Sequence, residues 1–459
     1  VRKLPHTKVR RFSMKKMSLF SLSWPIFIET LLFMMLGFID VFALSQYDDL
    51  ASASVGTANQ VAGICNLLFS VTATASAVII AQNLGAKNRE KASETAALSI
   101  FFNFSIGIIV SVVLVIFNRP MLSALGAEGK VLDFGSEYLT IVGCFMFGQA
   151  TLNSMNVVLR SHGYTRIPMY ITIVMNIINT VLDLTFVLGW FGMPVLGVTG
   201  VALATTFSRL VGGTILVIIF FKKVEKPSIF KKLFPFPFKD FWQMLKIGIP
   251  AAFESINYNI AQLVVTSIAL RFMTDNEYIT RSYIQNITST FYIFSQSIGQ
   301  GSQILTSHRV GAGKYDEAYH GVWRGLLAGY GLTAVMCTLG VIFRSQLIGI
   351  FTDNPEVIAI GGTLIIINVV LEAGRCTNLI VINSLRGAGD VYFPTAAAIF
   401  SMWVLSTFGS YLFVVVFGWG IYGMWIALAA DECFRGILMV CRWKGGKWRQ
   451  KSLVKNQQN

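Results

Sequence analysis

Long apolar stretches recur along almost the whole chain, and they constrain its fold more than any other feature. Of the 459 residues, 54% are hydrophobic and 13% are charged, whereas a soluble globular protein carries about 25% charged residues. A segment that crosses a bilayer needs about 20 mainly apolar residues, and its backbone must satisfy its hydrogen bonds internally, as a helix does. The sequence therefore predicts an all-α membrane protein.

Twelve stretches meet this length requirement, and a basic, proline-containing segment separates the first six from the last six. The first stretch is too long for the apolar region of a cleavable signal peptide, so we expect it to remain as a span. The predicted spans lie near residues 17–45, 52–82, 92–117, 132–159, 165–190, 196–222, 242–273, 278–307, 317–343, 355–384, 390–417 and 421–444.

Basic residues fall mainly on one side of this predicted topology. Most of the 37 Lys and Arg residues lie in the N-terminal segment, in every second loop and in the C-terminal tail. The positive-inside rule places these regions in the cytoplasm, which requires an even number of spans. The net charge of +14 thus reflects membrane topology, and we expect no nucleic-acid partner.

The two halves of the chain repeat one another. Pro25 and Glu29 in the first span recur as Pro250 and Glu254 in the seventh. Almost the same offset relates further residues along the chain. These are Gln82, Gly85 and Ala86 with His308, Gly311 and Ala312; Leu159, Arg160 and Gly163 with Leu385, Arg386 and Gly389; and Pro168 with Pro394.

This repeat predicts two pseudo-symmetric six-helix bundles. Six is an even number, so both halves enter the membrane with the same orientation, as in a parallel repeat about the membrane normal. We predict an N-lobe over 1–222 with spans 1–6, a cytoplasmic linker over 223–241, and a C-lobe over 242–459 with spans 7–12 and a basic tail. A duplicated bundle could be a passive channel or scaffold, but two halves around a midplane cavity are typical of a transporter.

Polar residues inside the spans indicate a functional site. Asp40 lies deep in span 1, and Thr172, Asn176, Asn179 and Asp183 share one helical face of span 5 at spacings of 4, 3 and 4. A charge at the bilayer centre costs about 2.5 to 3.5 kcal/mol on insertion scales. Buried amides and hydroxyls can simply hold helices together, but the two carboxylates have no basic neighbour one turn away, which favours a role in binding and releasing protons.

The second half of the chain also carries acidic residues in its spans. Glu254 follows Pro250, and Glu372 in span 10 can pair with Arg375 one turn away. Arg209 in span 6 needs a carboxylate partner that the sequence alone does not identify.

Aromatic and methionine residues offer an adaptable substrate surface. Polarizable thioethers and aromatic faces accept varied shapes and attract organic cations. Six residues, two of them amides, are candidates to line a substrate cavity: Phe33, Met34, Asn153, Met175, Asn176 and Phe186.

Several function classes are excluded by missing motifs. No GxxxxGK[ST] motif occurs, so the chain is no ATP-driven pump by itself. The four histidines form no HExxH or other catalytic cluster, and the six cysteines form no CxxC pair. We therefore expect no enzyme and no cofactor, and an ion gradient as the energy source.

These features together resemble the multidrug and toxic compound extrusion (MATE) transporters over nearly the whole chain, and in particular the bacterial DinF-like branch. The resemblance rests on a set of motifs rather than on any one of them. They are Pro25 and Glu29 with Pro250 and Glu254, Asp40, the segment 82–86 after span 2, the segment 159–163 after span 4, Asn179 with Asp183, and the segment 385–390 after span 10.

The resemblance implies twelve helices in two lobes that form a V, with antiport of drug-like or dye-like cations against H⁺ or Na⁺. Asp40, Asn156, Asn179 and Asp183 match the family's ion-coupling site in the N-lobe, with Thr199 as a further member. Glu254 and Glu372 match acidic positions that Na⁺-coupled members use, which makes them a possible second acidic site.

We choose H⁺ as the coupling ion because a proton can neutralise one carboxylate of an apolar lobe at low cost. A Na⁺ ion at Asp40, Asn179 and Asp183 needs several oxygens in a small shell, which requires spans 1, 4, 5 and 6 to converge. The expected protein is a monomeric multidrug exporter of the inner (plasma) membrane with both termini in the cytoplasm. The alternatives are a Na⁺-coupled MATE exporter, a lipid-linked precursor flippase, and a passive channel or scaffold.

Overall fold

The structure is a computed structural model that describes residues 17–454. The predicted basic N-terminal segment lies outside these residues. The described chain folds into helices, and no strand occurs within it. In the first half, the helices are α1 (Leu19–Ser45), α2 (Asp49–Gly85), α3 (Arg89–Ala124), α4 (Gly129–Cys144), α5 (Met146–Ser161), α6 (Arg166–Leu188), η1 (Trp190–Gly192) and α7 (Gly197–Lys223).

The second half repeats this order after the short helix of the linker. Its elements are η2 (Pro227–Leu233), α8 (Phe238–Phe272), α9 (Asp275–Gly311), α10 (Tyr315–Ile342), α11 (Arg344–Gly349), α12 (Pro355–Ala388), α13 (Tyr392–Ser401), η3 (Met402–Phe408), α14 (Gly409–Tyr411), η4 (Leu412–Val416), α15 (Gly420–Lys444) and η5 (Lys447–Gln450).

Twelve spans result, as the sequence predicts, although not all are equally apolar. Among the described residues, eight helices are long and apolar enough to cross a membrane by themselves, and the bent pair α4 and α5 makes nine. The other three spans are α8, α9 and α15. Helices α9 and α15 pack on α12, and α8 packs on α2. Polar side chains lower the mean hydropathy of these three helices. Because the side chains can face protein rather than lipid, the helices can still span the membrane.

Two spans are irregular in ways that the sequence does not predict. Span 4 is broken at Phe145, where α4 and α5 meet at an angle of 53°. Span 11 contains two π-helical segments, η3 and η4, on either side of α14. Irregular turns of this kind within helices are frequent near functional sites.

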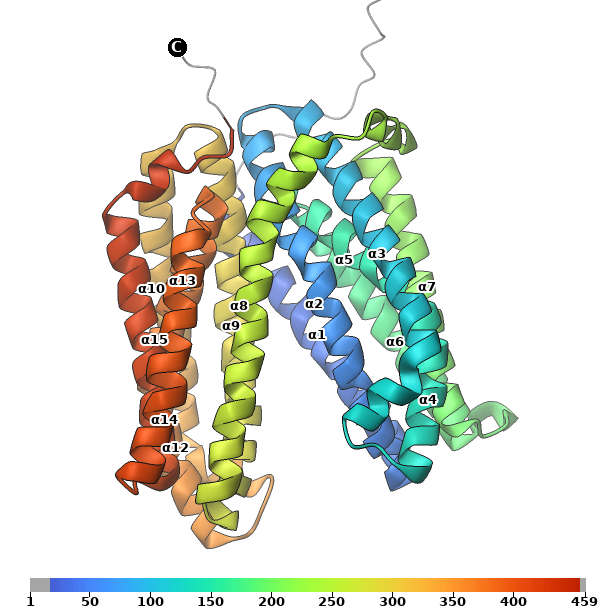
Figure 1. Ribbon diagram of the computed structural model, residues 1–459, viewed down its shortest axis with the longest axis vertical. Helices are drawn as coiled ribbons and strands as arrows, with labels where there is room; N and C mark the ends of the chain where they lie inside the picture. The colour runs from blue at the N-terminus through green and yellow to red at the C-terminus, as the bar shows by residue number, and fades with distance from the viewer. Residues whose placement is uncertain (1–16, 455–459) are drawn as a thin grey trace, which may run out of the picture.

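The helices form two lobes that meet at one end of the molecule (Figure 1). Helices α1 to α7 make one lobe and α8 to α15 the other. The lobes converge where α1 begins and α15 ends, and their ribbons diverge toward the opposite end. We call the converging end the terminal end. There, α2 contacts α8 and α9, and α1 contacts α9.

The first helix of each half reaches across to the other lobe at the terminal end. Leu22 and Ile26 of α1 pack with Ile304 and Leu305 of α9. In the same way, residues at the start of α8, among them Met244, belong to the apolar core of the first lobe. The proposed lobe boundaries stay a prediction: α7 ends at Lys223 and α8 begins at Phe238.

Candidate functional site

The two carboxylates singled out in the first lobe are neighbours. Asp40 of α1 and Asp183 of α6 are 2% and 0% exposed, and each acts electrostatically on the other. Thr205 of α7 donates from Oγ1 to Asp40 Oδ2 at 3.2 Å. Asn179 donates from Nδ2 to Thr205 Oγ1 at 3.3 Å. Three helices thus converge on one buried pair.

Tyr138 and Arg209 complete the surroundings of this pair. Tyr138 of α4 is fully buried and donates from its hydroxyl group to Asn59 Oδ1 at 3.4 Å. Arg209 lies close enough to Asp40 for its positive charge to act on that carboxylate, and the neutral phenol of Tyr138 lies within electrostatic range of Asp40. Arg209, for which the sequence identifies no partner, therefore faces the carboxylate pair. Its Nε atom has no hydrogen-bond partner among the described residues.

This arrangement can accept a cation. Four oxygens at the site lack a hydrogen-bond partner within the described chain: Asp40 Oδ1, Asn179 Oδ1 and both carboxylate oxygens of Asp183. Two buried carboxylates side by side disfavour a state in which both are charged. Either a proton on one of them or a small cation between the oxygens would relieve this repulsion. The donor set fits both ions.

The structure places two predicted members of this site elsewhere. Thr199 donates from its hydroxyl group to Glu137 near the start of α7. It lies six residues before Thr205, on the order of 9 Å along the helix axis. Asn156 lines the cavity described below, and its Oδ1 atom has no partner among the described residues. Thr205, which the sequence pattern does not indicate, donates to Asp40 instead, and Tyr138 lies within electrostatic range of both carboxylates.

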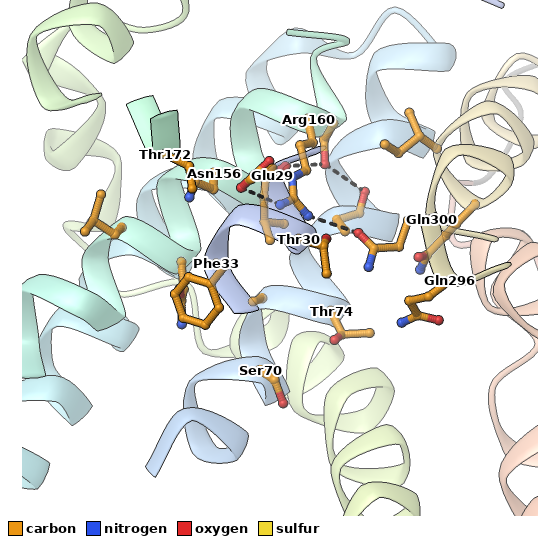
Figure 2. Close-up of a pocket in the computed structure, with 18 of the residues that line it drawn as sticks. Glu29, Thr30, Phe33, Ser70, Thr74, Asn156, Arg160, Thr172, Gln296 and Gln300 are labelled. Carbon is orange, nitrogen blue, oxygen red and sulfur yellow. Dashed lines mark hydrogen bonds and ion pairs between the residues drawn. The ribbon is translucent and has the colours of Figure 1, made fainter. Parts of the chain in front are cut away.

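A cavity of about 530 Å³ lies between the two lobes (Figure 2). Side chains of α1, α2, α5, α6, α8, α9 and α12 line it, so both lobes contribute. Asp40 and Asp183 are not among its lining residues. Eight amides contribute to its polar lining: Gln149, Asn153, Asn156, Asn176, Gln296, Gln300, Gln303 and Asn383.

Four of the six predicted substrate-lining residues reach this cavity: Phe33, Asn153, Met175 and Asn176. Met34 and Phe186 are not among its lining residues. Phe186 packs instead against Gly200 of α7, where a Cβ atom would approach the Cβ of Phe186 to 2.5 Å. The cavity wall therefore combines one exposed aromatic ring and a thioether with hydrogen-bonding amides.

Two equivalent ion pairs flank the cavity at the terminal end. Arg160 contacts Glu29 at 2.6 Å, and Arg386 contacts Glu254 at 2.5 Å. Arg160 also donates to Gln300 Oε1 of the other lobe at 3.0 Å (Figure 2). The repeat relates the two pairs to each other. The recurrence of both the glutamate and the arginine was the sequence signal that could have predicted this pairing.

Glu254 and Glu372, the possible second acidic site, are each paired with a different arginine. Glu372 contacts Arg375 at 2.6 Å, as its spacing suggests. Arg375 also forms an ion pair with Glu432, with 3.5 Å between Nε and Oε1. This network extends through Arg435, which contacts Asp431 at 2.5 Å and Glu432 at 3.3 Å. The buried carboxylates of the second lobe are thus held by fixed positive charges.

Comparison with known proteins defines the class of this molecule. The sequence profile of the MatE family matches residues 25–185 and 250–412, once in each lobe. The chain belongs to the MATE family of multi-pass membrane transporters, whose members handle small molecules.

Individual relatives cover almost the full chain. It is 39% identical to the uncharacterized transporter YisQ of Bacillus subtilis over 98% of both chains. It is 26% identical to the probable multidrug resistance protein NorM of Thermotoga maritima, over 95% of this chain and 94% of that protein.

Among solved structures, the fold is similar to the outward-facing conformation of a multidrug resistance MATE family transporter. The TM-score is 0.84 at 18% identity, over 94% of this chain and 96% of the other. A MOP superfamily transporter from Pyrococcus furiosus matches with a TM-score of 0.82 at 18% identity, over 93% and 94%.

Proposed function

We propose that this transporter exports amphipathic organic cations through the inter-lobe cavity in exchange for H⁺. The observation that carries the proposal is the pair of neighbouring buried carboxylates, Asp40 and Asp183. Three of their oxygens and the amide oxygen of Asn179 lack a hydrogen-bond partner among the described residues. A proton that binds there neutralises one buried charge, and its release restores the repulsion between the two carboxylates. The site thereby has two states that differ in charge.

Two helices link the carboxylate pair to the cavity. Asp40 lies on α1, which also carries Phe33 on the cavity wall. Asp183 lies on α6, which also carries Met175 and Asn176 on that wall. A change in the charge of the pair changes how α1 and α6 pack against each other. It would therefore reshape the cavity wall and couple proton binding to cation release.

We assign the terminal end to the cytoplasm of the cell. The basic loops and the basic tail lie at that end, as the positive-inside rule requires. The lobes are in contact there, and their ribbons diverge toward the other end (Figure 1), which this assignment places on the outer side of the membrane. On this assignment both termini of the protein lie on the cytoplasmic side of the inner membrane.

Two alternatives are less well supported. Coupling to Na⁺ would use the same unpartnered oxygens of Asp40, Asn179 and Asp183, and the test below separates the two ions. A flippase for lipid-linked precursors would need free positive charge in the cavity for a pyrophosphate group. Both arginines of the cavity wall, Arg160 and Arg386, are instead paired with glutamates.

The test is uptake of a fluorescent organic cation into proteoliposomes, with H⁺ and Na⁺ gradients imposed separately. We expect a pH gradient without Na⁺ to drive transport in the wild type. Dye uptake by the Asp40→Asn and Asp183→Asn variants should fall to the level of protein-free liposomes. An amide keeps the shape of the carboxyl group but does not titrate. Asp133→Asn is the matched control, since Asp133 is exposed and pairs with Arg119, which is exposed too. Transport that needs Na⁺ and persists without a pH gradient would contradict H⁺ coupling.

A further inference from the structure

The contact between the lobes at the terminal end contains two equivalent hydrogen bonds. Gln82 near the end of α2 donates from Nε2 to the backbone carbonyl oxygen of Gly387 in α12, at 2.8 Å. His308 near the end of α9 donates from Nε2 to the backbone carbonyl oxygen of Ser161 in α5, also at 2.8 Å. Each bond joins one lobe to the other.

The internal repeat relates these two bonds to each other. The offset that relates Gln82 to His308 also relates Ser161 to Gly387. Each lobe therefore contributes one side-chain donor and one backbone acceptor. The two donors are fully or almost fully buried, with exposed fractions of 0% for Gln82 and 7% for His308. Buried hydrogen bonds that cross an interface have no water to replace them while the interface stays closed.

Two glycines let the backbones approach closely enough for these bonds. A Cβ atom on Gly85 would lie 2.1 Å from the carbonyl oxygen of His308. A Cβ atom on Gly311 would lie 1.9 Å from the carbonyl oxygen of Gln82. Both contacts are shorter than any side chain tolerates, so α2 and α9 can meet in this way only with glycine at both positions. The repeat relates these glycines too.

The chain end reinforces only one of the two bonds. Gln82 Oε1 accepts a hydrogen bond from the backbone N–H of Leu453 at 2.9 Å. The amide of Gln82 is thus held at both its nitrogen and its oxygen. His308 has no corresponding second contact, since its Nδ1 atom lacks a partner among the described residues. The segment that follows α15 therefore adds one hydrogen bond on the Gln82 side of the contact, and this bond breaks its symmetry.

We propose that Gln82 and His308 are the two halves of a pseudo-symmetric latch that holds the lobes together at the terminal end. In each transport cycle both bonds must break for the cavity to open at this end. The purpose of the latch rests on the proposed transport function, but its existence does not, because it can be tested on the resting protein without any substrate.

The experiment measures the distance between the lobes at the terminal end by double electron–electron resonance. Spin labels are attached to Glu90→Cys and Glu317→Cys, which lie on exposed turns of α3 and α10, in a background without native cysteines. Gln82→Met and His308→Leu each remove one latch donor. His308→Leu should raise the ratio of long-distance to short-distance populations about fivefold, as expected for the loss of one hydrogen bond. Gln82→Met should raise the ratio further, because it also removes the acceptor of the Leu453 N–H. The double variant should show about the product of both effects.

Two control variants make the test specific. Asn83→Leu removes an equally buried amide whose hydrogen bond, to Ile79 O at 2.8 Å, stays within α2. It should leave the distances unchanged. His308→Gln places on α9 the residue that the chain itself uses on α2, and it should keep the wild-type distances.

The latch would be refuted by unchanged distances in both Gln82→Met and His308→Leu. Equal shifts in His308→Leu and His308→Gln would refute it as well, as would a comparable shift in Asn83→Leu. Dye uptake is measured separately on the same preparations. A wild type that transports no organic cation would overturn the proposed function and leave the distance measurement valid.

Discussion

Buried carboxylates among the described residues of this protein fall into two groups. Most of them, such as Glu29, Glu372 and Asp431, contact an arginine within 2.6 Å. Asp40 and Asp183 instead face each other, with Arg209 nearby but outside direct contact. A paired carboxylate holds the fold together, whereas a pair of like charges is stable only after it takes up a cation. This difference singles out the N-lobe pair as the candidate coupling site.

The Glu29–Arg160 pair should behave as a structural unit. Arg160→Met leaves the buried carboxylate of Glu29 without its partner, which we expect to cost about 3 to 5 kcal/mol. The double variant Glu29→Gln with Arg160→Met removes both charges and should recover most of this loss. Melting temperatures in detergent measure the effect. Arg119→Met serves as the control because its pair with Asp133 is exposed on both sides, and it should change stability by less than about 1 kcal/mol.

Equal melting temperatures for Arg160→Met and the double variant would contradict this prediction. They would show that Arg160 does not stabilise the protein by neutralising Glu29. The role of Arg160 would then reduce to its bond with Gln300 of the other lobe.

His162, in the turn between α5 and α6, should make stability depend on pH. Burial lowers its pKa to about 4, and the nearby positive charges of His308 and Arg89 act in the same direction. Between pH 6.5 and pH 4 the unfolded chain binds a proton at this site that the folded protein does not bind. Stability should therefore fall as pH drops through this window and level off below it.

The measurement compares melting curves of the wild type and His162→Asn between pH 7.5 and pH 4.5. An asparagine can keep the bond that His162 Nδ1 makes with Val158 O, at 2.8 Å, but it does not titrate. The variant should lose less stability on acidification. His320→Asn, at an exposed position of α10, should follow the wild type. Parallel curves for the wild type and His162→Asn would show that His162 is protonated equally in both states.

At the scale of elements, the segment that follows α15 acts between the lobes. Its helix η5 is anchored by the buried Trp448, whose ring stacks on Trp443 with centroids 4.1 Å apart. Beyond it, Leu453 packs against the apolar core of the first lobe. The end of a C-lobe helix thus reaches the N-lobe next to Gln82.

Leu453→Pro should weaken the closed contact at the terminal end. Proline removes the backbone N–H that Gln82 Oε1 accepts, whereas Leu453→Ala keeps that donor. The interlobe distances described above should shift further toward long values in Leu453→Pro than in Leu453→Ala. Combined with Gln82→Met, Leu453→Pro should add little, because the acceptor is already missing. If the shifts of Leu453→Pro and Gln82→Met are fully additive, Leu453→Pro does not act through the bond to Gln82.

At the scale of the whole molecule, the two lobes are related but carry different chemistry. They share the Glu–Arg pairs at the cavity and the two halves of the latch. Within residues 17–454, the neighbouring carboxylates of the first lobe, Asp40 and Asp183, form no ion pair with an arginine. Those of the second lobe belong to the network around Arg375 and Arg435. The duplication thus supplies a symmetric frame for movement, while the differences between the lobes set where a coupling ion can bind. The lobe boundaries themselves, with an N-lobe that ends at residue 222 and a C-lobe that begins at residue 242, stay a proposal.

The sequence by itself determined the class of fold. Span length, loop charge and an internal repeat are properties that can be read along the chain, because each span must be apolar over its own length and each loop lies next to its own helices. The twelve spans and two lobes follow from them. The helical spacing within span 5 also places Asp183 on one face with Thr172, Asn176 and Asn179.

Only the tertiary structure decided which polar groups meet. Thr205 rather than Thr199 contacts Asp40, and Arg160 rather than a residue of its own helix neutralises Glu29. The break at Phe145 and the bonds of Gln82 and His308 across the lobes also depend on it. Such contacts join residues far apart in the chain, so they depend on how each helix is rotated and displaced against its neighbours. Hydrophobic periodicity sets the buried face of a helix but not its register against another helix, which packing alone determines.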